Sequence, residues 1–222
     1  MKTKTFTLVL LALFLLLGTA RTSGQTFSLG AKVGAGISYF SNFDDYNGLI
    51  KRSPNIMVDG GVIANLSFTQ LISLQFEILY EQKGEKYKMT LGTTTQTSRF
   101  YLNYLTLPIL VEFSHSFGNF NLFGGLGPYM GYALNGKIKN PDTTENIEFG
   151  KDKFRRFDVG ASVDLGVGYK AGPGHIFLDL RYNYGLMDIQ QPKDKPEGYK
   201  SHCNRNFGIY LGYLIPLGKS SK

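Results

Sequence analysis

The chain has 222 residues, a formal net charge of +7 and a single cysteine. This length fits one domain, and one cysteine excludes an internal disulfide framework. The basic residues are dispersed among acidic ones and form no clustered basic stretch, which argues against a nucleic-acid partner.

The first residues have the layout of a secretory signal peptide. Lys2 and Lys4 supply a positive start, and an apolar stretch from Phe6 to Leu17 follows. Small residues come next, so cleavage after Ala20 or Gly24 is expected. The apolar stretch is too short to cross a bilayer as a helix, which needs about 20 residues. We therefore predict a signal peptide over residues 1–24 and an exported barrel domain over residues 25–222.

From about residue 26 onward, every second residue of a series of segments is apolar. The strands that this pattern predicts cover about 26–40, 56–68, 72–81, 101–114, 120–132, 157–170, 176–184 and 205–217. Strands of soluble sandwiches usually have about 5–6 residues, and most of these are longer. Long strands that are apolar on one side and small or polar on the other, with no intervening helix, predict a closed barrel in a lipid bilayer.

The most and least regular strands show how the two faces are assigned. In 157–170 the outward residues are Phe157, Val159, Val163, Leu165, Val167 and Tyr169, and the inward ones are Asp158, Gly160, Ser162, Asp164, Gly166 and Gly168. The strand over 101–114 is the least regular, because Leu105 to Val111 is almost continuously apolar. Pro108 cannot donate a ladder hydrogen bond, so we expect a β-bulge there.

The connections between the predicted strands alternate in length. Those after the first, third, fifth and seventh strands are long and polar, including a segment with Pro54, the stretch from Lys83 to Thr95 and about 135–156. The other connections have only a few residues. Bacterial outer-membrane barrels combine long external loops with short periplasmic turns. We therefore predict an all-β fold, an eight-stranded antiparallel up-and-down transmembrane β-barrel, in the bacterial outer membrane.

The alternation also places charged residues inside this barrel. They are Lys32, Glu77, Glu112, Asp164, Asp179 and Arg181. An eight-stranded barrel has room only for its own side chains or for one small ligand, and buried charges must be paired. We therefore expect a structural network of ion pairs that plugs the lumen. The alternative is a narrow polar path for ions or small solutes.

The sequence offers no catalytic or metal-binding signature. His115 stands between two serines, which resembles the His/Ser pairing of outer-membrane lipid A deacylases. It falls at an expected periplasmic turn, however, whereas lipid A occupies the outer leaflet. His175 also falls at such a turn, and His202 has no evident acid–base partner. Because no metal-spaced cluster or phosphate loop is present, we expect no enzyme, no cofactor and no metal site.

The predicted third external loop has mixed charge. Its cations are Lys137, Lys139, Lys151, Lys153, Arg155 and Arg156, and they alternate with Asp142, Glu145, Glu148 and Asp152. Such a mixture is typical of a solvated loop. Some of the cations could face lipopolysaccharide phosphates, to which their attraction would depend on salt.

Several stretches resemble the PorT-like family of outer-membrane barrel domains, which is typical of Bacteroidota. They are Gly30-Ala31-Lys32-Val33-Gly34, Leu74 to Tyr80, Tyr104 to Leu110, Gly127-Pro128-Tyr129 and Asp179-Leu180-Arg181-Tyr182. The resemblance implies an outer-membrane barrel, and the founding member is associated with the type IX secretion and gliding apparatus.

This resemblance and the predicted interior together give a functional expectation. We expect a non-enzymatic scaffold or interaction protein within a secretion or envelope assembly. Its partners would be outer-membrane lipids, lipopolysaccharide and other envelope proteins. A narrow porin-like channel is the alternative.

Overall fold

The computed structural model describes residues 26–41, 50–92, 94–190 and 197–217, so the predicted signal peptide lies outside the described residues. The strands are β1 (Thr26–Phe40), β2 (Ile50–Ser67), β3 (Ile72–Lys83), β4 (Glu85–Leu91), β5 (Thr94–Phe117), β6 (Phe120–Lys139), β7 (Thr144–Asn146), β8 (Phe157–Ala171), β9 (Gly174–Gly185) and β10 (Asn204–Pro216). In this part of the chain, no helix has the length and apolar composition of a membrane span.

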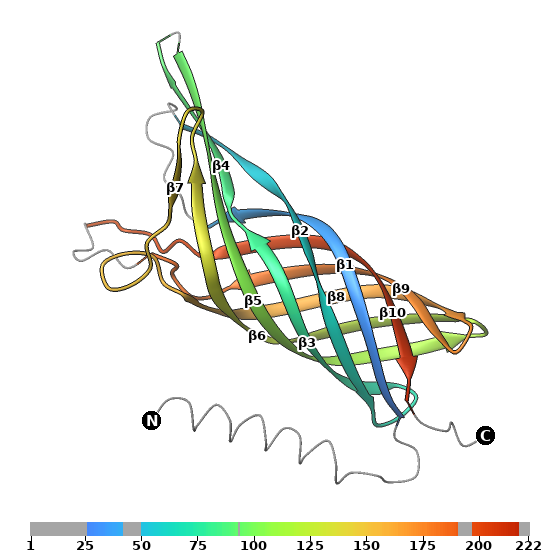
Figure 1. Cartoon of the computed structure of the whole chain (residues 1–222). Coiled ribbons are helices and arrows are strands. Elements are labelled where there is room, and N and C mark those ends of the chain that lie inside the picture. Colours follow the sequence, from blue (N-terminus) through green and yellow to red (C-terminus); the bar gives the residue numbers. More distant parts are fainter. Residues whose placement is uncertain (1–25, 42–49, 93, 191–196, 218–222) are drawn as a thin grey trace.

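Eight of these ten strands close a barrel (Figure 1). Around the ring the order is β1, β2, β3, β5, β6, β8, β9 and β10, and every neighbouring pair is antiparallel. β10 pairs back onto β1 along nearly all of β1, from Ser28↔Pro216 to Phe40↔Asn204. β4 continues the course of β3, and β7 lies beside the end of β6. The prediction of an eight-stranded antiparallel barrel is confirmed.

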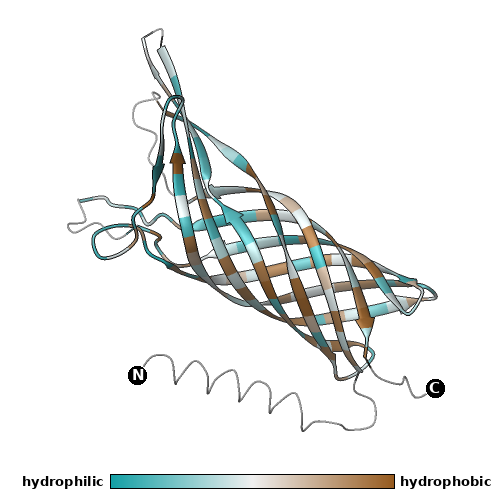
Figure 2. Cartoon of the chain, in the orientation of Figure 1, coloured by the Kyte–Doolittle hydropathy of each residue, from teal (hydrophilic) through white to brown (hydrophobic). Residues whose placement is uncertain are grey.

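The two faces of the wall have the predicted character. Outward residues such as Val33 and Leu165 are 66% and 64% exposed, whereas their inward neighbours Lys32 and Asp164 are 2% and 5% exposed. Large exposed apolar residues occur on all eight strands of the ring, and Figure 2 shows apolar positions along its wall. A continuous apolar outer wall is suited to lipid rather than to water.

The short connections gather at one end of the barrel, where β1 begins and β10 ends (Figure 1). β5 meets β6 at Gly118 and β8 meets β9 at Gly172, with φ angles of 61° and 60°. Both angles lie in the left-handed region that glycine adopts at little cost. By the loop asymmetry of outer-membrane barrels, this is the periplasmic end.

At the opposite end, the wall extends further than the sequence predicts. β2 begins at Ile50 and contains Pro54, β4 and β5 form a long hairpin, and β6 continues to Lys139. The expectation that these segments are loops is therefore wrong. Outside the bilayer the outward face meets water, so polar side chains occupy both faces and the apolar alternation disappears. The backbone nevertheless stays paired, because β2, β4, β5 and β6 supply one another with hydrogen-bond partners.

The expected bulge near Pro108 is also wrong. The register of β5 against β6 is the same at Leu107↔Met130 and at Val111↔Leu126. It shifts instead between Asn103 and Tyr104, where Leu134 is the extra residue of β6. Proline removes a hydrogen-bond donor but adds no residue, so the ladder of β5 with β3 is interrupted at Pro108 without a change of register, between Phe76↔Ile109 and Leu79↔Thr106.

Candidate functional site: the barrel interior and its two ends

Five of the six predicted interior charges form one connected network. Arg181 of β9 donates two hydrogen bonds to Glu77 of β3, from Nη1 to Oε2 at 2.5 Å and from Nη2 to Oε1 at 2.9 Å. Its Nη2 also lies 2.6 Å from Asp164 Oδ2. Lys32 Nζ donates to Asp179 at 2.9 Å and to Glu77 at 3.1 Å. Because β3 and β9 stand on opposite sides of the ring, the pair of Arg181 and Glu77 crosses the lumen.

The sixth predicted residue, Glu112, lies outside this network. Its Oε2 accepts hydrogen bonds from Asn65 Nδ2 at 2.7 Å and from Ser73 Oγ at 3.2 Å. Among the residues that the structure describes, it makes no ion pair. Its carboxylate is therefore held by neutral donors only.

A second layer, centred on Lys83, lies nearer the extracellular end. Lys83 Nζ lies 3.1 Å from Asp158 and 3.4 Å from Glu81. It also stands over the rings of Tyr104 and Tyr129, at 4.8 and 4.6 Å from their centroids. The sequence interpretation placed Lys83 in an external loop. Its even spacing, six residues, from the inward Glu77 of the same strand is the signal that would have placed it inside.

The extracellular end above this layer is closed by an apolar cluster, here called the cap. Its buried members are Phe40, Leu102, Tyr104, Ala133, Ile147 and Ile189, and Phe100, Ile138, Phe149 and Phe154 pack against them. Ile147, Phe149, Phe154 and Ile189 come from the long connections after β6 and β9. These connections thus fold inward, and their apolar residues cover the mouth of the barrel.

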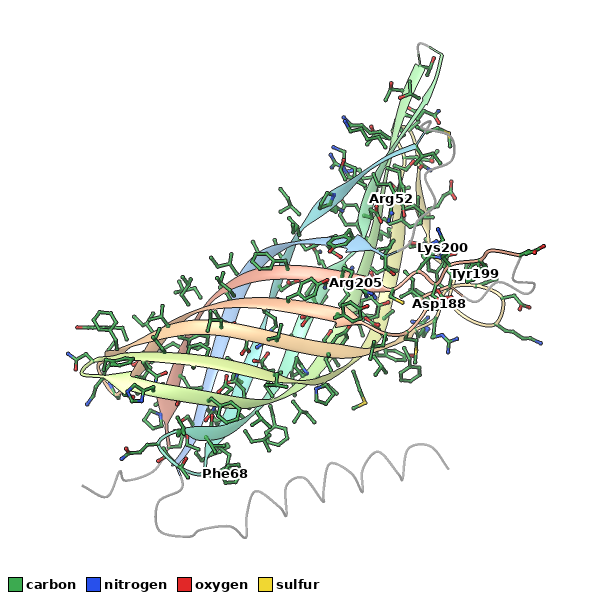
Figure 3. All side chains as sticks on the ribbon, turned by 180° about the vertical axis from the view of Figure 1, so that it is seen from behind. Arg52, Phe68, Asp188, Tyr199, Lys200 and Arg205 are labelled. Atoms are coloured by element: carbon green, nitrogen blue, oxygen red, sulfur yellow. The ribbon has the colours of Figure 1, made fainter. Side chains whose placement is uncertain are left out.

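Polar contacts hold the cap in place. Arg52 Nη2 donates to Glu85 Oε2 at 2.6 Å and to the carbonyl of Phe40 at 2.7 Å. In the last connection, Asp188 accepts a hydrogen bond from the hydroxyl of Tyr199 at 2.9 Å and another from the backbone N–H of His202 at 3.0 Å. Partial burial and the Asp188 carboxylate raise the pKa of the Tyr199 hydroxyl. Figure 3 places Arg52, Asp188 and Tyr199 at this end, far from Phe68 at the other.

The periplasmic half of the lumen is hollow. A cavity of about 320 Å³ is lined mainly by hydroxyl and amide side chains, with Phe123, Phe177 and His175, and includes Glu112. Gln75 lines it and donates a hydrogen bond to Glu77 at 2.7 Å. The ion-pair network therefore forms the inner end of this cavity.

The histidines do not form a catalytic group in the described part of the chain. His115 packs edge to face against Phe117 with ring centroids 4.4 Å apart, and His175 lines the periplasmic cavity. His202 lies at the extracellular end beside Tyr199. No three His, Cys, Asp or Glu side chains within the described ranges are arranged to hold a metal ion.

Comparisons with known proteins agree with this architecture. The family model described as "Outer membrane protein beta-barrel domain" matches residues 20–191. The structure is similar to that of Neisserial surface protein A, with a TM-score of 0.51 and 12% identity over 88% of this chain and 100% of that one. It is also similar to OprG from Pseudomonas aeruginosa, with a TM-score of 0.50 and 12% identity over 88% and 97%. None of the curated proteins matches the chain in sequence.

Proposed function

Because the chain belongs to the family of outer membrane protein β-barrel domains, we propose that it acts as a non-enzymatic scaffold or interaction protein of the bacterial outer membrane. The observation that carries this proposal is the closure of the lumen. The family and the fold establish an outer-membrane barrel, and the proposal concerns what that barrel does there.

Three features close the lumen in succession. The pair of Arg181 and Glu77 crosses it near mid-height, and Lys83 joins Glu81 to Asp158 above. The cap then covers the extracellular mouth. The side chains of Arg181, Glu77 and Lys83 have no solvent exposure, so a passing ion would have to break buried ion pairs. Breaking such a pair from one side costs about 3–5 kcal/mol.

The extracellular extension provides a surface for partners. β2, β4, β5, β6 and β7 form a continuous hydrogen-bonded sheet beyond the ring (Figure 1). A sheet with paired backbone is a rigid platform, and platforms of this kind suit contacts with other envelope proteins or with the membrane surface. We include lipopolysaccharide and envelope proteins among the proposed partners.

A finer assignment, to the PorT-like barrels and a secretion assembly, rests on the motifs in β1, β3, β5, β6 and β9. It is tested by crosslinking in native membranes followed by capture of the full-length chain. We expect components of a type IX secretion apparatus to be recovered. Recovery of abundant outer-membrane proteins alone, at the level of an unrelated barrel, would contradict this assignment.

A narrow porin-like channel is the second candidate, because the periplasmic half of the lumen is hollow. Recording from the purified barrel in planar bilayers separates the two. We expect no stable stepwise conductance from the natural protein. The double variant Arg181→Ala with Glu77→Ala, which removes the pair that crosses the lumen, is the matched comparison and should conduct more often. Stable steps from the natural protein would establish the channel and refute the closed barrel.

A further inference from the structure

The outward surface of the extracellular sheet carries a group of cations, here called the basic face. Its members are Lys51 of β2, Lys86 and Lys88 of β4, Arg99 of β5, and Lys137 and Lys139 of β6. Directly opposed residues of antiparallel strands project from the same side of a sheet. Lys51 is opposed to Lys88, Lys86 to Arg99, and Arg99 in turn to Lys139.

The other side of the same sheet has a different character. Glu85, Tyr87, Phe100 and Ile138 alternate with the cations along β4, β5 and β6, and they point toward the cap. Glu85, which precedes Lys86 in β4, is thus directed inward, where it holds Arg52. The sheet separates an apolar, internally paired side from a cationic outer side.

The basic face lacks a counter-charge from the described parts of the chain. Its outward positions on β2, β4, β5, β6 and β7 are otherwise serine, threonine, asparagine and tyrosine, without Asp or Glu. None of the six cations forms an ion pair with a described residue. Like charges placed directly opposite each other destabilise a sheet. An anion from outside the chain would therefore relieve the repulsion within the row of Lys86, Arg99 and Lys139.

The position of the basic face indicates where this anion lies. Down β6 from Lys139 and Lys137, the outward residues become Asn135 and then the exposed Leu134 and Tyr132 of the lipid-facing wall. β5 repeats this order, from Arg99 through Tyr101 and Asn103 to the exposed Leu105. Asn103 and Asn135 are hydrogen-bonded at 2.7 Å. Hydrocarbon, polar interface and charged headgroup follow one another in the same order at a membrane surface.

We propose that the basic face binds the phosphate groups of lipopolysaccharide in the outer leaflet that surrounds the barrel. This inference rests on the proposed role as an interaction protein of the outer membrane and identifies one partner and its site. It differs from the sequence expectation, which assigned this contact to the mixed charges of 135–156. In that segment Lys153 is paired with Glu148, and Arg156 donates to the carbonyls of Ala133 and Leu134. Only Lys137 and Lys139 belong to the basic face.

The test uses the full chain folded into phosphatidylcholine nanodiscs and native mass spectrometry to count retained lipid A molecules. The variant Lys86→Glu, Arg99→Glu, Lys139→Glu alters the central row of the basic face. The variant Lys151→Glu, Lys153→Glu, Lys170→Glu makes the same change of charge at exposed positions elsewhere. Heat-modifiable migration on gels verifies that each variant is folded. The probes are bisphosphorylated lipid A, monophosphoryl lipid A and inorganic phosphate.

We expect the basic-face variant to retain bisphosphorylated lipid A about tenfold less well or worse, since each cation near an anionic surface contributes appreciably to binding. The matched variant should retain it nearly as the natural protein does. Monophosphoryl lipid A should be retained less, and retention should fall with added salt. Equal losses in both variants, equal retention of the two lipids, or displacement by millimolar inorganic phosphate would overturn the inference. None of these outcomes affects the proposal of a closed barrel, which is tested separately by the conductance recordings in planar bilayers.

Discussion

Arg181 and Glu77 are 104 positions apart in the chain, yet they form a two-pronged ion pair across the lumen. Each comes from a strand on the opposite side of the ring, β9 and β3, and neither side chain has any solvent exposure. Asp164 and Asp179 contact the same guanidinium group. One arginine thereby links three carboxylates from three strands, which makes it the centre of the predicted plug.

Replacing Arg181 with Leu should destabilise the barrel by about 3–5 kcal/mol, because it leaves buried carboxylates without their cation. Lys151→Leu, at an exposed position in an external connection, should change stability by less than about 0.5 kcal/mol. The chain has no tryptophan, so unfolding in urea is followed by far-ultraviolet circular dichroism and by gel migration. Equal, small effects of both substitutions would show that water reaches the carboxylates around Arg181.

The Lys83 layer allows a double-mutant cycle. Lys83→Met leaves Glu81 and Asp158 without their cation and should cost about 3–5 kcal/mol. Adding Asp158→Asn removes one orphaned charge, so the double variant should be more stable than the sum of the single effects predicts. We expect a coupling of about 1–3 kcal/mol. Strict additivity in urea unfolding would mean that the 3.1 Å contact between Lys83 and Asp158 contributes little.

Two interior glycines differ in the space that surrounds them, so we expect only one of the two positions to accept alanine. A Cβ at Gly61 would lie 2.0 Å from the carbonyl oxygen of Ile78 and 2.8 Å from the Cα of Leu79, both backbone atoms that cannot turn aside. A Cβ at Gly168 would meet its nearest atom at 3.7 Å, an ordinary contact. Gly61→Ala should therefore cost about 1–3 kcal/mol or more, and Gly168→Ala about 0.5 kcal/mol or less.

The yield of folded, heat-modifiable barrel from the two glycine variants provides the measurement. If Gly61→Ala folds as well as Gly168→Ala, the backbones of β2 and β3 do not approach each other closely at Gly61.

A small reagent that enters from the periplasmic side should reach the cavity and should be stopped by the ion-pair network. In a Cys203→Ser background, Ser73→Cys places a thiol in the periplasmic cavity, and Ser38→Cys places one above the ion-pair network, where Ser38 is 0% exposed. A small charged methanethiosulfonate reagent should modify the first within minutes and leave the second unmodified. Mass spectrometry measures the adduct, and unfolding in urea provides the positive control for both thiols. Rapid modification of Ser38→Cys in the folded barrel would mean that the plug leaks.

Much of the wall could be predicted from sequence alone. In a barrel that spans lipid, the period of two decides which face each residue occupies. The pattern is strict there because a charged residue on the outward face would be exposed to hydrocarbon. The outward sets of β1, β8 and β9 therefore follow directly from the chain, as do the inward positions of Lys32, Asp164 and Arg181. Prediction was weaker where lipid no longer acts. Above the bilayer both faces are polar, so the extension of β2 to Ile50 and of β6 to Lys139 gave no apolar signal.

The sequence by itself determined the alternating strands, the eight strands of the ring and the inward positions of Lys32, Glu77, Glu112, Asp164, Asp179 and Arg181. Tertiary structure alone decided how those charges pair, because Arg181 and Glu77 meet only after the ring has closed with β3 opposite β9. It also decided that Glu112 stands apart beside a cavity, that Lys83 pairs with Asp158 of a distant strand, and that six cations form one outward face. Each of these facts depends on register between strands distant in sequence, and the spacing within a single strand carries no information about that register.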